Sequence, residues 1–286
     1  MSDSWRLTLP CSRDDAVRIG NAEIEGAVLV ATEENEASGR WRLDVYCEHE
    51  PDAAMREEIA ALVPGADLPA AERLDEQDWV TLSQAGLEPV RAGRFVVHTA
   101  AHPESAPLGG RAFLIEAGQA FGTGHHETTA GCLAMLDALA AEVDRFDNII
   151  DLGTGTGLLA FAARELWDDA HVMATDIDPV AIEVTRANMA ANGISDIALV
   201  VAEGAGSLPV PAGTFDLVIA NILAQPLIEM AGDVAALARP GATLVLAGLL
   251  STQASAVIAA YVTHGFVTDR RDVRGDWAIL GMRKAR

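Results

Sequence analysis

Cysteine is scarce in this chain of 286 residues, and the three cysteines, Cys11, Cys47 and Cys132, stand far apart. Because no CxxC pair occurs, the sequence predicts neither a disulfide framework nor a zinc knuckle. Such sparse, unpaired cysteines favour a protein of the reducing cytoplasm.

Long apolar runs are also absent. No stretch approaches the roughly 20 apolar residues that a membrane-spanning helix needs. The opening segment MSDSWRLTLP lacks the basic region and apolar run of a secretory signal peptide. We therefore expect no membrane association and a cytoplasmic location.

Basic residues are outnumbered, since 20 Lys and Arg face 42 Asp and Glu and leave a formal net charge of −22. An acidic surface can simply serve solubility, but it also repels nucleic-acid phosphates and favours basic proteins as partners. No lysine-rich run offsets that repulsion. We expect no direct sequence-specific nucleic-acid binding, and we expect the chain to act as a monomer.

Half of the residues are hydrophobic, which is enough for a sizeable core and, at this length, for two domains. Residues 1–75 alternate short elements in the order strand, helix, strand, strand, helix and a last strand. That order predicts a small ferredoxin-like α+β domain. Its 7 arginines and 17 acidic residues give a net charge of −10. No residue in it suggests catalysis, so we interpret it as a substrate-recognition domain.

Residues 76–117 connect the two halves as a linker, with a linking helix over 75–86 and lead-in strands at 94–100 and 111–117. From residue 118 to 286 the chain alternates helices and strands in the manner of a doubly wound, Rossmann-like sheet. Seven strands are predicted, and the last two form an antiparallel hairpin around Arg274-Gly275-Asp276. In the helix over 179–193 we expect Asp178 as the cap, with Val180, Val184, Ala187 and Ala191 as the buried stripe.

Candidate binding residues follow the strands of this sheet, where open α/β sheets bind ligands. In DLGTGTG, Gly153 and Gly155 lie between the first strand and its helix and allow close approach of a ligand. The spacing does not match the GxGxxG motif, so the sequence does not indicate pyrophosphate binding. The alternative to a ligand-binding loop is an ordinary tight turn between strand and helix. Asp176 ends the next strand and can bind both hydroxyls of a ribose.

Two further strand ends complete the candidate site. Glu203 follows the third strand, where an adenine edge is expected, and Asn221 ends the fourth strand and points its amide into the same cleft, unless that amide is only structural. The glycine turn does not match a pyrophosphate-binding motif, and it lies beside an acid that can bind a ribose. Together these features suggest a nucleoside without phosphates. S-adenosylmethionine meets that description, and methyl transfer from it mainly requires alignment and exclusion of water.

The segment GQAFGTGHHETTAGCL (118–133) allows two interpretations. It is either a metal site built on His125 and His126 or a lid over a small ligand. Adjacent histidines do not easily face one ion, and no third ligand is near in the sequence. We therefore expect no metal.

Five segments together resemble the ribosomal protein methyltransferases of the PrmA family, class I enzymes that use S-adenosylmethionine: AFGTGHHETT, DLGTGTGLLAFAA, TDIDPVAIEVTRANMAANG, FDLVIANIL and AGLLSTQASAVIAAY. The resemblance covers residues 118–286 and extends into the linker around Trp79, whereas residues 1–75 agree only in element order. Ala117 stands where the family usually has proline.

The resemblance implies that the 118–133 loop folds over the cofactor, which favours the lid. It also implies cofactor contacts at Thr129, Gly153, Asp176 and Asn221, and methylation of lysine side chains and the N-terminal amine of ribosomal protein L-eleven. Beside these contacts we expect Phe121, Gly155 and Glu203 to bind the cofactor. We expect Phe121 to form an apolar wall that lowers the lysine pKa, and the Asn221 carbonyl to orient the amine as the catalytic group.

Three alternatives stay open at this point. The chain could methylate lysine in another protein, such as the beta subunit of electron-transfer flavoprotein, although the N-terminal domain favours the ribosomal substrate. A nucleic-acid amino methyltransferase commonly has an aromatic residue after the fourth strand, where this chain has Asn221-Ile222-Leu223. A non-catalytic module that binds S-adenosylmethionine would carry the same motifs.

Overall fold

The computed structural model describes residues 4–19, 24, 27–35, 40–47, 49–74, 89–115, 127–142 and 145–286. The predicted linking helix over 75–86 and the loop residues 118–126 lie outside this part of the chain. The chain divides into two compact units, Met1–Ser83 and Gln84–Arg286.

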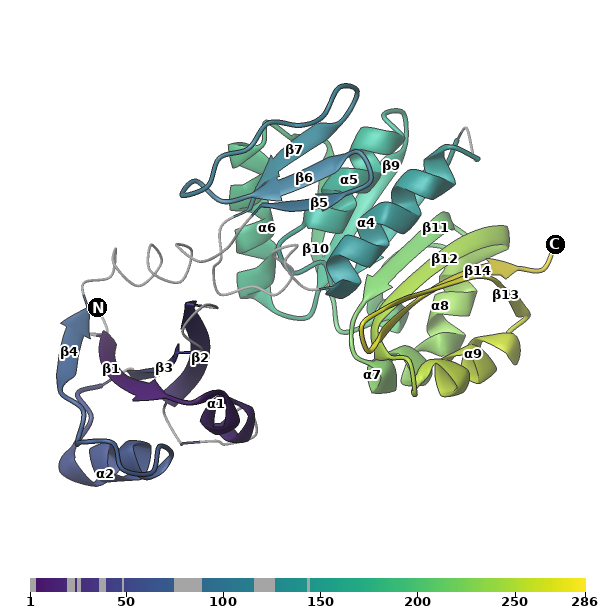
Figure 1. The fold of residues 1–286 in the computed structure, drawn as a ribbon. Helices are drawn as coiled ribbons and strands as arrows, with labels where there is room; N and C mark the ends of the chain where they lie inside the picture. The colour runs from purple at the N-terminus through teal and green to yellow at the C-terminus, as the bar shows by residue number, and fades with distance from the viewer. Residues whose placement is uncertain are drawn as a thin grey trace. The chain divides into compact units, whose positions relative to one another are not determined.

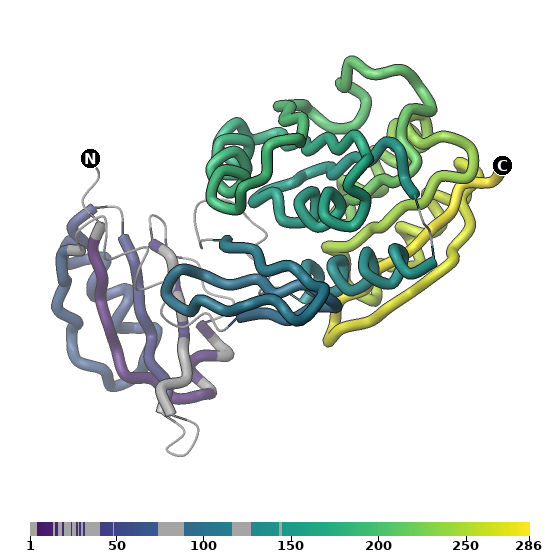
Figure 2. Tube along the Cα trace, turned by 90° about the horizontal axis from the view of Figure 1, so that it is seen from above, coloured from purple at the N-terminus to yellow at the C-terminus, as the bar shows by residue number. Residues whose placement is uncertain are grey.

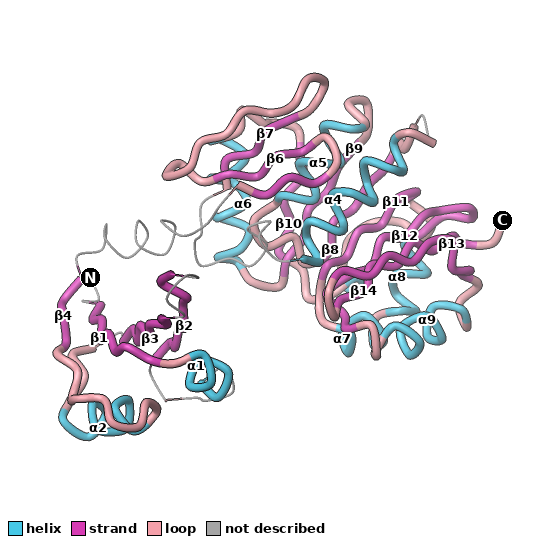
Figure 3. Tube along the Cα trace, in the orientation of Figure 1, coloured by secondary structure: helices cyan, strands magenta, loops and turns pink. Residues whose placement is uncertain are grey.

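Among its described residues, the N-terminal unit has a four-stranded antiparallel sheet and two helices, which Figure 3 colours by secondary structure. Its sheet order is β2-β3-β1-β4. Along the chain the elements are β1 (Ser4–Cys11), α1 (Arg13–Ile19), β2 (Ala27–Asn35), β3 (Arg40–Cys47), α2 (Ala53–Ala61) and β4 (Ala71–Leu74). This is the predicted βαββαβ order in a ferredoxin-like arrangement.

The core of this unit follows from alternation along two central strands. Leu7 and Leu9 in β1, and Leu43 and Val45 in β3, are fully or almost fully buried, and they pack in one cluster with Ile59 of α2. Residues two apart on a strand face the same side of a sheet, so the strands place these side chains on the face that the helix covers.

The second unit holds a seven-stranded sheet in the order β10-β9-β8-β11-β12-β14-β13 (Figure 1). The first five strands in this order, β10, β9, β8, β11 and β12, are parallel to one another. β14 is antiparallel to its two neighbours, β12 and β13. The strands are β8 (Asn148–Leu152), β9 (His171–Asp176), β10 (Ile197–Val201), β11 (Phe215–Asn221), β12 (Ala238–Leu250), β13 (Phe266–Arg274) and β14 (Trp277–Lys284). The predicted doubly wound sheet and its C-terminal hairpin are therefore confirmed.

Helices cover both faces of this sheet, so the central strands are buried on both sides. The helices of this unit are α4 (Glu127–Ala140), α5 (Leu158–Leu166), α6 (Pro179–Ala191), the 3-10 turn η1 (Ala205–Ser207), α7 (Ala224–Glu229), α8 (Ala231–Leu237) and α9 (Ala254–Val262), among the described residues. In β11, Leu217 and Ile219 pack into one core cluster, whereas Val218 and Ala220 pack into the other. Figure 2 shows α4 beside the C-terminal hairpin, which it contacts.

A separate three-stranded sheet precedes α4. It consists of β5 (Val90–Ala92), β6 (Phe95–His98) and β7 (Arg111–Leu114), of which only β6 and β7 correspond to predicted strands. Two polar side chains attach this sheet to the helices. Asp137 of α4 accepts a hydrogen bond from the Arg94 N–H at 3.0 Å. The Asn192 amide, at the end of α6, exchanges two hydrogen bonds of 2.8 Å with the backbone of Leu114.

The predicted buried stripe of α6 is wrong. Val180 is 45% exposed, and Ala187 and Ala191 are exposed as well. The buried residues of this helix are Ala181, Ile182, Thr185, Asn188 and Met189. Two of these are polar, so a pattern drawn from apolar residues alone selects the wrong face of the helix.

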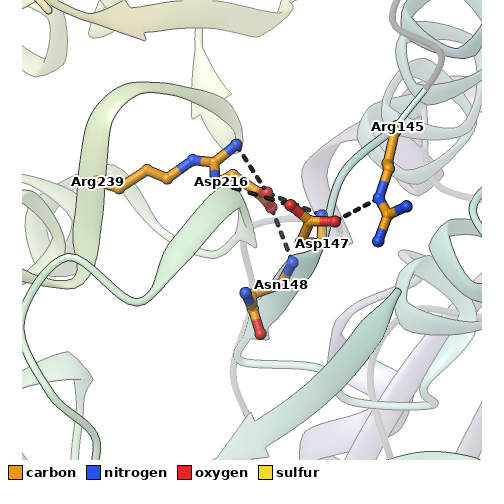
Figure 4. A network of polar contacts seen from close by, with 5 residues as sticks. All are labelled: Arg145, Asp147, Asn148, Asp216 and Arg239. Carbon is orange, nitrogen blue, oxygen red and sulfur yellow. Dashed lines mark hydrogen bonds and ion pairs between the residues drawn. The ribbon is translucent and has the colours of Figure 1, made fainter. Parts of the chain in front are cut away.

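A buried carboxylate ties together the first residues of β8, β11 and β12 (Figure 4). Asp216 is 2% exposed and accepts hydrogen bonds from the backbone N–H groups of Asp147 and Asn148 at 2.8 and 3.0 Å. Arg239 pairs with the same carboxylate at 3.1 Å. The network lies at the amino ends of the parallel strands, away from the edge where ligands bind. Its role is therefore to hold the sheet together.

Among the described residues, no helix is long and apolar enough to cross a membrane.

The Asp216 network predicts a loss of stability in Asp216→Asn. The amide cannot accept from two backbone donors and pair with Arg239 as the carboxylate does, so we expect the free energy of unfolding to fall by about 1–3 kcal/mol. Denaturant unfolding followed by circular dichroism measures this. Asp196→Asn is the matched control, because Asp196 is exposed and its pair with Arg164 is 3.8 Å long. Equal stability of the two variants would contradict the role of Asp216.

Candidate functional site

The turn between β8 and α5 is built from glycines that no other residue can replace without strain. Gly153, Gly155 and Gly157 have φ angles of 69°, 56° and 88°, in the left-handed region. Neighbouring side chains also leave no room, because a Cβ on Gly153 would lie 2.4 Å from Ile222 Cγ2. The main chain is thus exposed to a ligand at the carboxyl end of β8.

Asp176, the last residue of β9, binds this turn. Its Oδ2 accepts a hydrogen bond from the Gly155 N–H at 2.9 Å, and its Oδ1 accepts from the Asp178 N–H at 3.0 Å. Asp178 has a different task, because its own carboxylate accepts from the Val180 N–H at 2.8 Å and caps α6. The predicted cap is confirmed. Both Asp176 and Asp178 line the cavity, but the Asp178 carboxylate is already engaged by α6.

Asn221 ends β11 and meets the first turn of α4. Its Nδ2 donates a hydrogen bond to Thr129 Oγ1 at 3.1 Å. Its Oδ1 is buried and has no hydrogen-bond partner among the described residues. Buried polar atoms are nearly always paired, so this amide oxygen is available to accept a hydrogen bond from a ligand or a water molecule.

One cavity of about 750 Å³ joins these groups, a volume typical of sites for small molecules. Gly153, Gly155 and Asp176 line it, together with Asn221 and Thr129. Its remaining walls are largely apolar and include Ile177, Ile222, Leu223, Ala205 and Met230. The cavity lies where β8, β9 and β11 end, which is the edge that the strand order predicts.

A buried acid lies directly behind the turn. Asp151 is 1% exposed and accepts a hydrogen bond from Thr154 Oγ1 at 2.7 Å. Burial raises the pKa of the Asp151 carboxyl to about 7, and the hydrogen bond from Thr154 opposes that rise. Near neutral pH the carboxyl is therefore only partly ionised, which limits the cost of burying it.

Of the seven predicted site residues, five line the cavity. Glu203 is exposed and is not among the cavity-lining residues, although its neighbours Ala202 and Gly204 are. Phe121 lies outside the described residues, as do His125 and His126. Within the described part of the chain, no group of three or more His, Cys, Asp or Glu side chains could hold a metal ion.

The cavity is also lined by residues that were not predicted from the sequence, among them Ile177, Leu223, Met230 and Trp277. Ile177 carried a signal in the sequence, because it is an apolar residue between two acids. In the structure its side chain is 66% exposed and fills no core. Leu223 is similarly exposed, directly after the Asn221-Ile222 pair. Met230 lies between α7 and α8, and Trp277 begins β14, so only the fold brings them to this edge.

Comparison with known proteins shows similarity to ribosomal protein L11 methyltransferases along nearly the whole chain. The ribosomal protein L11 methyltransferase (PrmA) family pattern matches residues 13–285. A ribosomal protein L11 methyltransferase of Agrobacterium fabrum is 43% identical over 267 residues, which is 91% of this chain and 90% of the relative. One of Brucella melitensis biotype 2 is 40% identical over 286 residues, 97% of this chain and 99% of the relative.

A solved structure agrees with the fold as well as the sequence. The crystal structure of a ribosomal protein L11 methylase from Lactobacillus delbrueckii subsp. bulgaricus superimposes with a TM-score of 0.61 at 28% identity, and covers 70% of this chain and 100% of that chain. Because the family pattern runs through both compact units and the relatives match over nine-tenths or more of their length, this chain belongs to the PrmA family of ribosomal protein L11 methyltransferases.

Proposed function

We propose that this chain transfers methyl groups from S-adenosylmethionine to lysine side-chain amines and the N-terminal amine of ribosomal protein L11. As a member of its family it is a methyltransferase that uses S-adenosylmethionine. The observation that carries the proposal is the convergence of the glycine turn, Asp176 and Asn221 on one cavity.

The donors and walls of the cavity fit S-adenosylmethionine. Asp176 offers carboxylate oxygens to the two ribose hydroxyls, and the glycine turn lets the backbone approach without side chains. The apolar side chains of Ile177 and Met230 offer surfaces for the adenine ring. When bound, S-adenosylmethionine supplies a methyl group on a sulfonium that leaves as a neutral thioether.

The amine must be unprotonated when it attacks, and this requirement falls on the protein. A lysine amine has a pKa near 10.4 and an α-amine one near 8. Apolar surroundings disfavour the charged ammonium and lower its pKa. Ile222 and Leu223 follow Asn221 and line the cavity, so they supply such surroundings within the described residues. Phe121 is proposed as a further wall.

Asn221 is proposed to orient the amine. Its Nδ2 is engaged by Thr129, which fixes the side chain, and its buried Oδ1 can accept a hydrogen bond from the amine nitrogen. An amide oxygen at this position aims the nitrogen lone pair without needing to titrate. Alignment of this kind is the main contribution that methyl transfer asks of a protein.

The N-terminal unit is proposed to recognise the protein substrate. The described residues that line the cavity all belong to the second unit. The net charge of −10 over residues 1–75 suits a basic partner. We further propose that the chain acts as a monomer in the cytoplasm and does not read nucleic-acid sequence, because its net charge of −22 repels phosphates and no aromatic residue follows Asn221 directly.

The division of labour between the two acids after β9 gives a first prediction. In Asp176→Ala, binding of S-adenosylmethionine should weaken by roughly 1–3 kcal/mol, because the ribose hydroxyls lose their acceptor. Asp178→Ala is the matched control. It removes the cap of α6 and should lower the free energy of unfolding by about 1 kcal/mol. Asp178 also lines the cavity, but its carboxylate is engaged by the Val180 N–H, so Asp178→Ala should lose less affinity than Asp176→Ala.

Titration calorimetry and denaturant unfolding on the same two variants measure both quantities. The account of this site fails if Asp178→Ala loses more affinity than Asp176→Ala, or if folded Asp176→Ala binds as tightly as the unaltered chain.

The separate recognition unit gives a second prediction. A truncated protein of residues 84–286 should bind S-adenosylmethionine within about threefold of the full chain, yet methylate ribosomal protein L11 at least roughly a hundredfold more slowly. The reason is that remote docking energy positions a macromolecular amine. Activity of the full chain should also fall as salt is raised, since screening weakens the attraction between acidic and basic surfaces.

Calorimetry on both proteins serves as the control that the shorter one is intact. A truncated protein that binds the cofactor and still methylates L11 at a comparable rate would show that residues 1–83 serve another purpose.

A further inference from the structure

The face of α6 that packs against the glycine turn carries polar side chains at the contact. Thr185 is fully buried and Asn188 is 8% exposed. The two residues are three apart, so their side chains lie on one face of the helix. Burying a hydroxyl and an amide costs free energy unless each is hydrogen-bonded, so this face has a specific partner to satisfy.

That partner is the main chain of the glycine turn. Thr185 Oγ1 donates a hydrogen bond to the Gly155 carbonyl at 2.8 Å, and Asn188 Nδ2 donates to the Thr156 carbonyl at 2.9 Å. The Gly155 N–H is already held by Asp176 at 2.9 Å. Both polar groups of Gly155 and the next carbonyl are therefore fixed from β9 and α6. We call Asp176, Thr185 and Asn188 the turn clasp.

The turn needs such a clasp because it is made of glycines. A glycine reaches φ angles that other residues avoid, and it also loses more freedom than any other residue when it is held in one conformation. Thr185 restricts the turn sterically as well, because a Cβ on Gly157 would lie 2.7 Å from the Thr185 Cγ2. Hydroxyl and methyl of one side chain thus hold two of the glycines in place.

We propose that Thr185 and Asn188 are positioning residues for S-adenosylmethionine. They hold the glycine turn in its binding conformation before the cofactor arrives. Neither residue is among those that line the cavity, so both act through the turn. A turn that is already ordered binds its ligand without paying for its own ordering. This inference rests on the proposed cofactor site.

A positioning role of this kind affects the affinity for the cofactor and leaves the rate of methyl transfer unchanged once the cofactor is bound. Only a fraction of molecules lacking a clasp hydrogen bond has the turn in the binding conformation, and the apparent affinity falls by that fraction. The KM for S-adenosylmethionine should rise, whereas kcat at saturating cofactor should stay near the wild-type value. The product S-adenosylhomocysteine lacks only the methyl group, so its affinity should fall by the same factor.

The test compares two substitutions at one position in the full chain. Thr185→Val keeps the shape of the side chain and removes the hydroxyl, whereas Thr185→Ser keeps the hydroxyl. Calorimetry should show that Thr185→Val weakens binding of both S-adenosylmethionine and S-adenosylhomocysteine roughly five- to thirtyfold. Thr185→Ser should stay within about threefold of wild type. Circular dichroism establishes that each protein is folded at the temperature used.

Asn188→Ala provides an independent variant, since alanine favours the helix and removes the donor to Thr156. It should weaken binding of both ligands in the same direction. The inference is overturned if folded Thr185→Val and Asn188→Ala bind like wild type, or if Thr185→Ser binds as weakly as Thr185→Val. A wild-type chain that binds neither ligand would instead remove the proposed cofactor site, and the inference with it.

Discussion

The hydrogen bond from the Gly155 N–H to the Asp176 carboxylate joins the two strand ends that form the cavity. β8 and β9 are parallel neighbours, so their carboxyl ends lie at one edge of the sheet. At that edge the glycine turn removes side chains, and Asp176 adds a charge that is partly satisfied by backbone donors. The Asp178 cap starts α6 directly afterwards and brings Thr185 and Asn188 beneath the turn. The geometry of the site thus depends on a short polar connection between two βα units.

The opposite ends of the strands have a different task. There Asp216 and Arg239 bind the starts of β8, β11 and β12 and hold the sheet in register, far from the cavity. Acidic side chains therefore serve stability at one edge of the sheet and, in the proposed site, ligand binding at the other. The strongly acidic composition as a whole is the basis of our proposal that long-range attraction brings a basic protein partner to the chain.

The order of elements and the edge that carries the site followed from local patterns, because glycine turns, strand ends and caps are encoded within a few residues. Asp178 is such a case. The buried face of α6 was missed because Thr185 and Asn188 are buried to satisfy carbonyls, and apolar periodicity does not register that. β5 has three residues, too few for a pattern. Met230 and Trp277 reach the cavity through contacts between elements distant in the sequence, which only the folded chain reveals.

Transfer of labelled methyl groups tests the central claim most directly. The full chain is incubated with S-adenosylmethionine labelled in its methyl group and a mixture of large-subunit ribosomal proteins in cell lysate, and the labelled products are identified by mass. The account predicts label on amines of ribosomal protein L11. Label on another protein, such as the beta subunit of electron-transfer flavoprotein, or on nucleic acid would contradict it, and so would binding of the cofactor without transfer to any macromolecule.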